Sequence, residues 1–376
     1  MKIPRYLLSR LAEQLRSQHK ILLLYGARQT GKTTLSEDIL AQFSERIFKV
    51  NADELKYTDI LSSRDLNKLK LLTEGYDILF IDEAQRISNI GINLKLLHDN
   101  IPNLKLLVTG SSSLDLANQV KEPLTGRSLT YTLFPISMME LRKIYNPIEL
   151  QGRLEEFMIY GQYPEVLSLS TVNQKLKYLR ELTSSYLYKD IFEITTIRNR
   201  NKVKNLLKLL ALQIGSEASL NEIANKLQLS QETVSAYINL LEKSYVLFRL
   251  SGFRRTLRNE ISKKDKIYFW DLGVRNALID NFSFMDSRND VGAMWENLMI
   301  AERLKYLSYS EIYCSSYFWR TYSGSEIDYV EECDGELFAY EIKYNKPKKR
   351  PPKGWVENYS NNYTCISKDN FWEFIT

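Results

Sequence analysis

The segment from Gly26 to Thr33 constrains this chain more than any other feature. Its sequence, GARQTGKT, fits the pattern G-x-x-x-x-G-K-[ST] without a mismatch. An apolar run of strand length, ILLLY, precedes it, and an amphipathic helical segment, TTLSEDILAQF, follows it. Glycines allow the backbone to wrap, so that its N–H groups point at phosphates beside a helix N-terminus. The sequence therefore predicts a phosphate-binding loop formed by Gly26, Ala27, Arg28, Gln29, Thr30, Gly31, Lys32, Thr33 and Thr34.

A second segment, ILFIDEA, completes the predicted nucleotide site. It is a buried strand that ends in Asp82 and Glu83, at the edge of a parallel sheet where ligands bind in open α/β folds. Lys32 is expected to neutralise the β and γ phosphates of ATP, while Thr33 and Asp82 hold Mg²⁺. Glu83 is expected to polarise the attacking water, which a hydrolase needs and a kinase does not. The two segments together predict Mg²⁺-dependent hydrolysis of ATP.

Three further residues are candidates for the same site. Thr109 and Ser111 end the strand-like run LKLLVTGS, where they contact the γ-phosphate or the attacking water, or simply form the turn. Arg127, in LTGR, is expected to be an arginine finger, within its own chain or toward a neighbouring subunit of a homo-oligomer. A surface arginine is the alternative.

These segments resemble a prokaryotic family of AAA+-type P-loop ATPases that carry a C-terminal domain of uncharacterised function, DUF4143. The resemblance rests on GARQTGKTTL, ILFIDEAQRI, VTGSSS and LTGR, followed by LFPIS and Glu140, and later on GQYPEV, YLYKDI, FWDLGVRNAL and WENLMIAERL. It implies ATP-site roles for the matching residues, which are Lys32, Thr33, Asp82, Glu83, Thr109, Ser111 and Arg127. It implies no particular cellular role.

A helix–turn–helix pattern lies at 219–243. Ser219 and Ser230 are the expected N-caps of its two helices, and strand-like segments at 246–250 and 266–270 are expected to form a wing. From Arg198 to Asp265 there are 13 Lys and Arg against 6 Asp and Glu, a net charge of +7 that exceeds the +5 of the whole chain. Arg254, Arg255 and Arg258 lie near the wing. This winged-helix pattern favours contact with nucleic acid through phosphates, and docking of a protein partner is the alternative.

The tail of the chain carries acidic residues and a lysine in a recognisable order. Glu296 lies in a helical segment, Asp328 in the strand-like run SEIDYV, and Glu341 and Lys343 in ELFAYEIKY. Alternation places Glu341 and Lys343 on one face of a strand, where Asp328 of the neighbouring strand can meet them. This arrangement resembles the core of the PD-(D/E)XK nucleases. It favours a second divalent-metal site for cleavage, or a degenerate nuclease-like fold that is kept for binding.

Composition limits the remaining classes of function. The chain has only two histidines, so a His-rich metal site or a Ser/His/Asp triad has almost no residues to use. Three widely spaced cysteines with no C-x-x-C pair argue against a zinc ribbon and a disulfide framework, and favour a reducing compartment. Neither a signal segment nor an apolar run of about 18 residues is present. We expect a cytoplasmic protein without membrane contact.

The length of 376 residues is expected to hold several domains of α/β class. Residues 1–145 are predicted to form an AAA+-like P-loop core with a parallel sheet, and 146–200 a small helical lid or linker. Residues 201–260 are predicted to form the winged helix and 261–376 the nuclease-like α/β domain.

Overall fold

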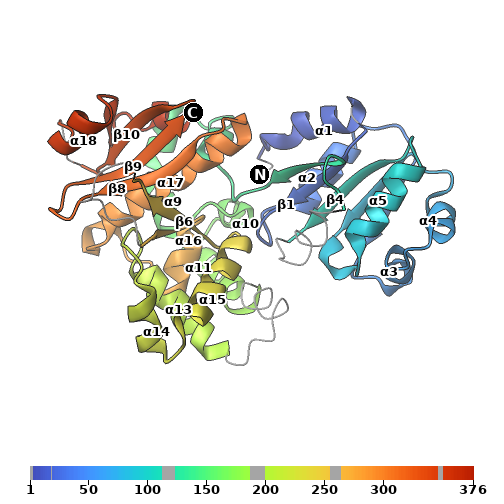
Figure 1. Cartoon of the computed structure of the whole chain (residues 1–376), viewed down its shortest axis with the longest axis horizontal. Helices are drawn as coiled ribbons and strands as arrows, with labels where there is room; N and C mark the ends of the chain where they lie inside the picture. Colours follow the sequence, from blue (N-terminus) through green and yellow to red (C-terminus); the bar gives the residue numbers. More distant parts are fainter. Residues whose placement is uncertain (1–2, 18, 112–122, 187–199, 255–263, 346–349) are drawn as a thin grey trace.

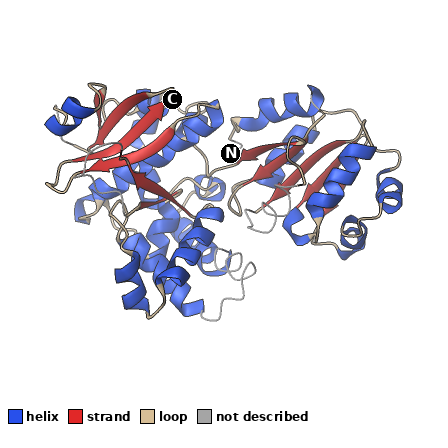
Figure 2. Cartoon of the chain, viewed as in Figure 1, coloured by secondary structure: helices blue, strands red, loops and turns tan. Residues whose placement is uncertain are grey.

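The computed structural model of the chain describes residues 3–17, 19–111, 123–186, 200–254, 264–345 and 350–376. Within these residues the strands form one sheet of five and one sheet of six (Figure 2). Figure 1 shows the five-stranded sheet and its helices on the right, the six-stranded sheet at the upper left, and a group of helices below it. The predicted α/β class with a parallel sheet core is confirmed.

The N-terminal sheet is parallel throughout, with the strand order β2-β3-β4-β1-β5. Its strands are β1 (Ile21–Tyr25), β2 (Ile47–Asn51), β3 (Ile78–Asp82), β4 (Lys105–Gly110) and β5 (Ser128–Thr132). Every residue of β1 and β3 is buried, as expected for parallel strands covered on both faces. Because all strands point the same way, the segments that follow β1, β3 and β4 meet at one edge.

Helices cover both faces of this sheet, and the pleat of β1 divides its residues between two cores. The helical elements of this region are α1 (Leu7–Ser17), α2 (Lys32–Leu40), α3 (Leu55–Leu61), α4 (Leu66–Thr73), the 3-10 turn η1 (Ala84–Arg86) and α5 (Ile90–Asn100). Leu22 and Leu24 pack against α1 and α2, whereas Leu23 packs with α3, α4 and α5 on the opposite face. The sheet is therefore held rigidly on both sides of the edge that carries the loops.

Short helices continue the chain beyond β5. They are α7 (Met138–Leu141), α8 (Pro147–Gly152), α9 (Leu154–Tyr160), α10 (Pro164–Ser168), α11 (Val172–Glu181) and the π-helical turn η2 (Leu182–Tyr186). Asn146 caps α8 and Pro147 occupies its first turn, so the predicted border at 145/146 coincides with the start of a helix.

Three helices and a hairpin share the next core. They are α13 (Arg200–Leu212), α14 (Leu220–Leu227), α15 (Gln231–Lys243), β6 (Leu247–Gly252) and β7 (Lys266–Phe269). Ser219 and Ser230 accept hydrogen bonds from the backbone N–H groups of Glu222 and Thr233, as N-caps do. β6 and β7 pair antiparallel, so the predicted border at 260/261 falls between two strands that are hydrogen-bonded to each other.

The six-stranded sheet has the order β11-β10-β9-β8-β6-β7. Its remaining strands are β8 (Ser315–Arg320), β9 (Glu326–Cys333), β10 (Glu336–Ile342) and β11 (Tyr363–Ile366). The helical elements from 271 onward are α16 (Leu272–Leu278), the 3-10 turn η3 (Met285–Ser287), α17 (Val291–Ser310), α18 (Lys353–Asn358) and α19 (Trp372–Ile375). β8, β9 and β10 run antiparallel, while β11 pairs parallel with β10. β6 pairs parallel with β8, so the hairpin and the tail of the chain form one sheet.

Two sequence segments, GQYPEV and FWDLGVRNAL, contact each other closely in this part of the fold. The Asp271 carboxylate accepts hydrogen bonds from the backbone N–H groups of Gln162 and Val274, at 2.6 and 3.0 Å. A Cβ atom on Gly273 would lie 2.0 Å from the carbonyl oxygen of Tyr160. Glycine is therefore required at 273, because α16 contacts the backbone at the end of α9 directly.

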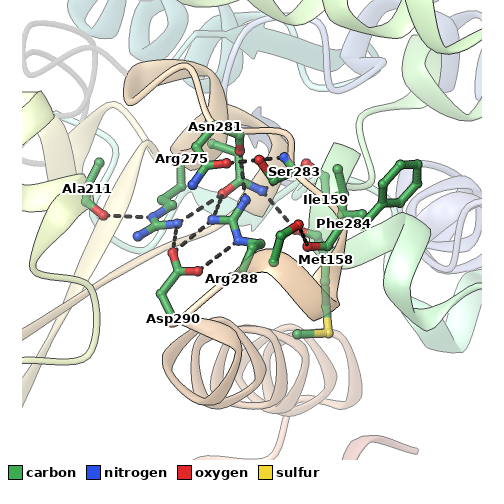
Figure 3. Close-up of polar contacts among 11 residues, drawn as sticks. Met158, Ile159, Ala211, Arg275, Asn281, Ser283, Phe284, Arg288 and Asp290 are labelled. Atoms are coloured by element: carbon green, nitrogen blue, oxygen red, sulfur yellow. Dashed lines mark hydrogen bonds and ion pairs between the residues drawn. The ribbon is translucent and has the colours of Figure 1, made fainter.

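A buried ion-pair cluster joins α16 to the start of α17 (Figure 3). The Asp290 carboxylate accepts hydrogen bonds from Arg275 at 2.6 Å and from Arg288 at 2.8 Å. Arg275 also donates to the carbonyl oxygen of Ala211 in α13, at 2.7 Å. Both guanidinium groups are almost fully buried, so Asp290 is the charge that compensates them.

One expectation about the cysteines is wrong. Cys314 and Cys333 form a disulfide. The antiparallel register of β8 and β9 pairs Ser315 with Glu332, and this places the two cysteines opposite each other at the open end of the hairpin. Their separation of 19 residues in sequence gave no sign of this proximity.

Among the helices of the described residues, none is both long enough and apolar enough to cross a bilayer.

Candidate functional site

The phosphate-binding loop joins β1 to α2, as its sequence predicted, and its two glycines are needed for different reasons. A Cβ atom on Gly26 would lie 2.2 Å from the carbonyl oxygen of Leu133, so only glycine fits there. Gly31 has a φ of 93° and is the N-cap of α2. This left-handed conformation favours glycine and turns the loop backbone toward the helix axis.

Lys32 is the first residue of α2, and its ammonium group lies inside the loop. Its Nζ atom donates to the carbonyl oxygens of Gly26 and Ala27, both at 2.9 Å. The side chain is only 5% exposed. A buried lysine whose charge is bound to backbone oxygens can turn to phosphate oxygens with little loss of rotamer freedom. Thr33 and Thr34, the next two residues, are exposed on the first turn of the helix.

Thr33 and Asp82 meet at the edge of the sheet. The Thr33 hydroxyl donates to Asp82 Oδ2 at 2.7 Å, and the backbone N–H of Glu83 donates to Asp82 Oδ1 at 3.1 Å. The hydroxyl of Thr109, at the end of β4, donates to Asp82 Oδ1 as well. A hydroxyl and a carboxylate this close provide the hard oxygen ligands that Mg²⁺ prefers, so these residues fit the metal that the fold implies.

Glu83 follows β3 in a left-handed conformation, with a φ of 54°. A non-glycine residue at positive φ is uncommon, and here it directs the side chain away from the strand. The Gln85 amide donates to Glu83 Oε2 and, at 2.9 Å, to the hydroxyl of Ser111. Ser111 lies 3.4 Å from Glu83 Oε2. Thr109 and Ser111 therefore each contact one of the two carboxylates, and Gln85 is a member of the site that the sequence did not single out.

Arg5 is a second residue that the sequence gave no reason to select. Its guanidinium donates to the carbonyl oxygen of Thr30 in the loop and to that of Phe134, both at 2.7 Å. It also pairs with Glu140 at 3.0 Å. Burial is the largest single effect and opposes the charge, but Glu140 and Tyr309 together outweigh it and raise the pKa of Arg5 above its ordinary value. Arg5 thus fixes the loop to the LFPIS segment.

The helical region also contacts the loop. The hydroxyl of Tyr178, in α11, donates to Gln29 Oε1 at 2.7 Å. Arg28, which precedes Gln29 in the sequence, is half-buried. One residue of the segment that was predicted as the helical lid therefore contacts the loop that is expected to hold the phosphates.

Arg127 lies at the opposite edge of the sheet. Its carbonyl oxygen accepts a hydrogen bond from the backbone N–H of Ile21, the first residue of β1, whereas the loop follows the last residue. Five residues of strand span about 16 Å. The guanidinium instead pairs with Asp99 at 2.8 Å. Hydrogen bonds from Arg127 and then His98 lower the pKa of the Asp99 carboxyl to about 2. The structure therefore does not bring Arg127 to the phosphate-binding loop of its own chain, and a finger role toward a neighbouring subunit stays a prediction.

The C-terminal carboxylates and lysine come together as the sequence predicted. Lys343 Nζ lies 2.9 Å from Asp328 Oδ2 and 3.1 Å from Glu341 Oε1. Glu296 approaches from α17, and its pKa responds to the charges of Asp328 and Lys343. Burial is the main cause that raises the pKa of Glu296, to about 7.

Two residues of β7 enter this cluster that the sequence had not assigned to it. Lys266 Nζ lies 3.3 Å from Glu296 Oε1 and 2.5 Å from Glu326 Oε1. The Tyr268 hydroxyl donates to Glu296 Oε1 at 2.5 Å. Both residues fall in the strand-like segment 266–270 that was predicted as part of the wing, and the pairing of β6 with β8 joins this hairpin to the strands of the tail.

Comparison with family models divides the chain in three. Residues 18–142 match the AAA domain, residues 151–284 match a domain of unknown function, DUF8612, and residues 291–368 match a second, DUF4143. The DUF8612 match includes both strands of the β6–β7 hairpin.

The curated relatives are themselves uncharacterised. An uncharacterised protein of Methanocaldococcus jannaschii is 27% identical over 316 residues, which cover 77% of this chain and 71% of the relative. One of Mycobacterium tuberculosis is 24% identical over 326 residues, covering 86% of this chain and 70% of the relative.

Among solved structures, the Walker-type ATPase of Pyrococcus abyssi has a TM-score of 0.52 at 18% identity and covers 74% of this chain and 96% of its own. At this identity the likeness concerns the fold alone. It agrees with the parallel sheet, the loop between β1 and α2, and the carboxylates after β3. The chain thus combines an N-terminal AAA domain of P-loop ATPase fold with a C-terminal DUF4143 domain.

Proposed function

We propose that this protein hydrolyses ATP with Mg²⁺ and that its nucleotide state controls how the C-terminal half contacts nucleic acid. The observation that carries the first part is the meeting of Lys32, Thr33, Asp82 and Glu83 at one edge of the sheet. Thr33 and Asp82 would hold Mg²⁺, which neutralises charge on the phosphates when it is bound. Gly26 to Thr34 would surround the phosphates with backbone N–H groups.

Glu83 is the proposed general base. Its carboxylate is half-buried at the end of β3, where Gln85 and Ser111 orient it, and among the described residues it forms no ion pair. A carboxylate without an ammonium partner keeps its oxygens available to accept a proton from water. Thr109 and Ser111 would position the two carboxylates, and this gives them a role in the site without requiring contact with phosphate.

The coupling of the two halves is supported by a chain of hydrogen bonds that begins at the loop. Arg5 contacts both Thr30 and Phe134. The segment after Phe134 is then held by α17: the Tyr309 hydroxyl accepts from the Phe134 N–H at 3.1 Å, and Glu302 accepts from the Met138 N–H at 2.6 Å. A displacement of the loop by nucleotide would therefore reach α17, the helix that carries Glu296.

Basic side chains support contact with nucleic acid. The exposed basic residues on the three-helix and hairpin region are Arg200, Lys204, Lys208, Lys226, Lys243, Arg254 and Lys264. Arg255 and Arg258, which the sequence also placed near the wing, lie outside the described residues. The exposed start of α15 carries Gln231 and Glu232 but no arginine, which favours contact through phosphates over readout of bases.

The test is steady-state phosphate release from ATP at low salt, with and without duplex DNA, and with single-stranded RNA as a separate arm. We expect nucleic acid to raise turnover severalfold, and the rise to disappear at high salt because phosphate contacts release counterions. Unchanged turnover in every arm would refute the coupling to nucleic acid and favour a nucleotide switch that docks a protein partner.

A second candidate function is an ATP-gated nuclease that uses a second divalent metal. The observation in its favour is that Glu296, Asp328, Glu341 and Lys343 converge in one cluster. Cleavage of DNA with Mg²⁺ or Mn²⁺ that is lost in Asp328→Ala and in Lys343→Ala would establish it. Intact DNA in both metals would count against it.

A homo-oligomer in which Arg127 acts on the neighbouring site gives a further prediction. Lys32→Ala and Arg127→Ala are each expected to lower turnover at least about 50-fold, since one removes phosphate binding and the other the finger. Mixing the two inactive variants is expected to restore about a quarter or less of wild-type turnover, because mixed interfaces contain one intact site. Wild-type turnover in Arg127→Ala alone would contradict the shared site.

A further inference from the structure

Lys266 is a second ammonium group in the C-terminal carboxylate cluster, and unlike that of Lys343 its side chain is buried. It comes from β7, on the hairpin, and not from the helix and strands that supply Glu296, Asp328, Glu341 and Lys343. Its side chain is 3% exposed and reaches Glu296 at 3.3 Å and Glu326 at 2.5 Å. The Phe318 ring lies beneath the ammonium, with its centroid 5.3 Å from Nζ.

The backbone around Lys266 fixes this position. Lys266 pairs with Leu250 of β6 on one side and forms a bridge with Glu217 on the other. The residues on both sides of it are also held: the Asp265 carbonyl accepts from the Ala218 N–H at 2.9 Å, and the Ile267 carbonyl accepts from the Gly215 N–H at 3.1 Å. A lysine on a strand paired on both sides cannot swing away by a small loop movement.

One oxygen of Glu296 and one of Asp328 are already engaged. Glu296 Oε1 accepts from both Lys266 and the Tyr268 hydroxyl. Asp328 Oδ2 accepts from Lys343 at 2.9 Å and from the backbone N–H of Ile342 at 2.8 Å. A divalent cation bound between Glu296 and Asp328 would lie beside the Lys266 ammonium in a buried environment, where like charges repel strongly. The Lys266 ammonium in this position therefore disfavours a divalent metal.

We propose that Lys266 is the resident cation of this cluster and excludes divalent metal from it. Lys343 alone is the lysine expected of a nuclease-like site, and it leaves Glu296 without a cation partner. Lys266 supplies that partner from a different part of the chain. In this form the cluster is a closed ion-pair network, and metal binds only when the Lys266 charge is removed or withdrawn.

This inference concerns the second candidate function and is independent of ATP hydrolysis. If it holds, a nuclease activity of this chain would be silent at rest, and the gate would be a side chain of the hairpin that also borders the three-helix region. Failure of the ATPase proposal would leave it untouched, because its test uses neither nucleotide nor turnover.

The experiment measures Mn²⁺ binding to the full chain without nucleotide, by calorimetric titration and by the thermal midpoint of unfolding. All variants carry Asp82→Asn, so that the nucleotide site contributes no metal ligand. The parent protein is compared with Lys266→Met and with Lys266→Gln, which retains hydrogen-bond donors but no charge. Lys266→Met combined with Asp328→Asn is the control, because it also removes one of the carboxylates that a metal would need.

We expect the parent protein to show no stoichiometric Mn²⁺ site at this cluster. Both Lys266 variants are expected to gain one, with a Kd for Mn²⁺ at least about tenfold lower than that of any residual binding by the parent protein. The thermal midpoint of both variants should rise with Mn²⁺, because a ligand that binds only the folded state stabilises it. The double variant should lose the gain.

Two results would overturn the proposal. One is Mn²⁺ binding by the parent protein that Asp328→Asn abolishes, which would show that Lys266 does not exclude the metal. The other is a Lys266→Gln protein that unfolds cooperatively without gaining a metal site. If Lys266→Met fails to fold, the parent titration and Lys266→Gln decide the question.

Discussion

Replacing Glu83 with glutamine is expected to lower kcat for ATP hydrolysis at least about 100-fold and to leave the Kd for ATP within about threefold. General-base catalysis contributes roughly 10²–10⁴-fold, and glutamine keeps the shape of the side chain but cannot accept the proton. The hydrogen bonds from Gln85 and Ser111 should hold the amide that the substitution introduces in the position of the original carboxylate. Binding should survive because Lys32, Thr33 and Asp82 are unchanged.

Phosphate release at saturating ATP, together with a fluorescent nucleotide titration, separates the two effects. Lys32→Ala is the comparison, since it removes the ammonium that the loop holds at Gly26 and Ala27 and should weaken binding itself. If Glu83→Gln turned over at the wild-type rate, another group would be the base. If it lost nucleotide affinity as fully as Lys32→Ala, Glu83 would be a binding residue.

Replacing Asp290 with asparagine is expected to destabilise the protein by about 3 kcal/mol at pH 7. The change leaves the buried guanidinium groups of Arg275 and Arg288 without their shared counter-charge, and removal of one partner of a buried ion pair costs roughly 3–5 kcal/mol. Burial alone would raise the pKa of the Asp290 carboxyl, but hydrogen bonds from Arg288 and Arg275 outweigh it and lower the pKa to about 2.

The pH dependence of this loss follows from the lowered pKa. A carboxyl whose pKa is lower in the folded state contributes stability above its unfolded pKa of about 3.9, and that contribution is lost as pH falls through the folded value. The difference in unfolding free energy between wild type and Asp290→Asn should be constant above about pH 5 and shrink toward pH 2. Urea unfolding at several pH values measures it.

A matched control is available on the surface. Asp280 pairs with Arg180 at 2.9 Å, but both side chains are more than half exposed. Asp280→Asn should change the unfolding free energy by no more than about 1 kcal/mol, as exposed pairs do. Equal losses in the two variants would mean that the burial of the Asp290 cluster does not matter.

The nucleotide site was predictable because the residues that form it lie in contiguous segments of the sequence. The loop lies directly between β1 and α2, and Asp82 and Glu83 directly follow the apolar residues of β3, so local pattern and local structure coincide. The order of Glu296, Asp328 and Glu341 was informative for a similar reason, since each falls on a helix or strand with a clear periodicity of apolar residues. Gln85 lies two residues beyond Glu83, and the expectation that β3 ends in a tight turn would have been enough to predict it as a residue of the site.

The residues that the sequence missed act across long separations. Arg5 and Glu140 are 135 residues apart, and only the packing of α1 beside the loop brings them together. Arg127 lies at the edge away from the loop because it directly precedes β5, which runs parallel to β1. Lys266 and the Cys314–Cys333 disulfide depend on strand registers that no local pattern encodes.

The shared six-stranded sheet limits how this protein can be dissected. β6 is paired with β7 from Leu247 to Leu250 and with β8 at Ser251 and Gly252, so it is an interior strand. A fragment that ends at residue 260 would lose both neighbours at once and expose Leu247, Phe248 and Leu250, which are buried in the whole chain. Unpaired apolar strands promote aggregation, so an insoluble three-helix fragment would carry no information about what that region binds. Fragments for binding work should keep residues 134–376 together, because Ile136, Met138 and Leu141 belong to the core of the C-terminal half.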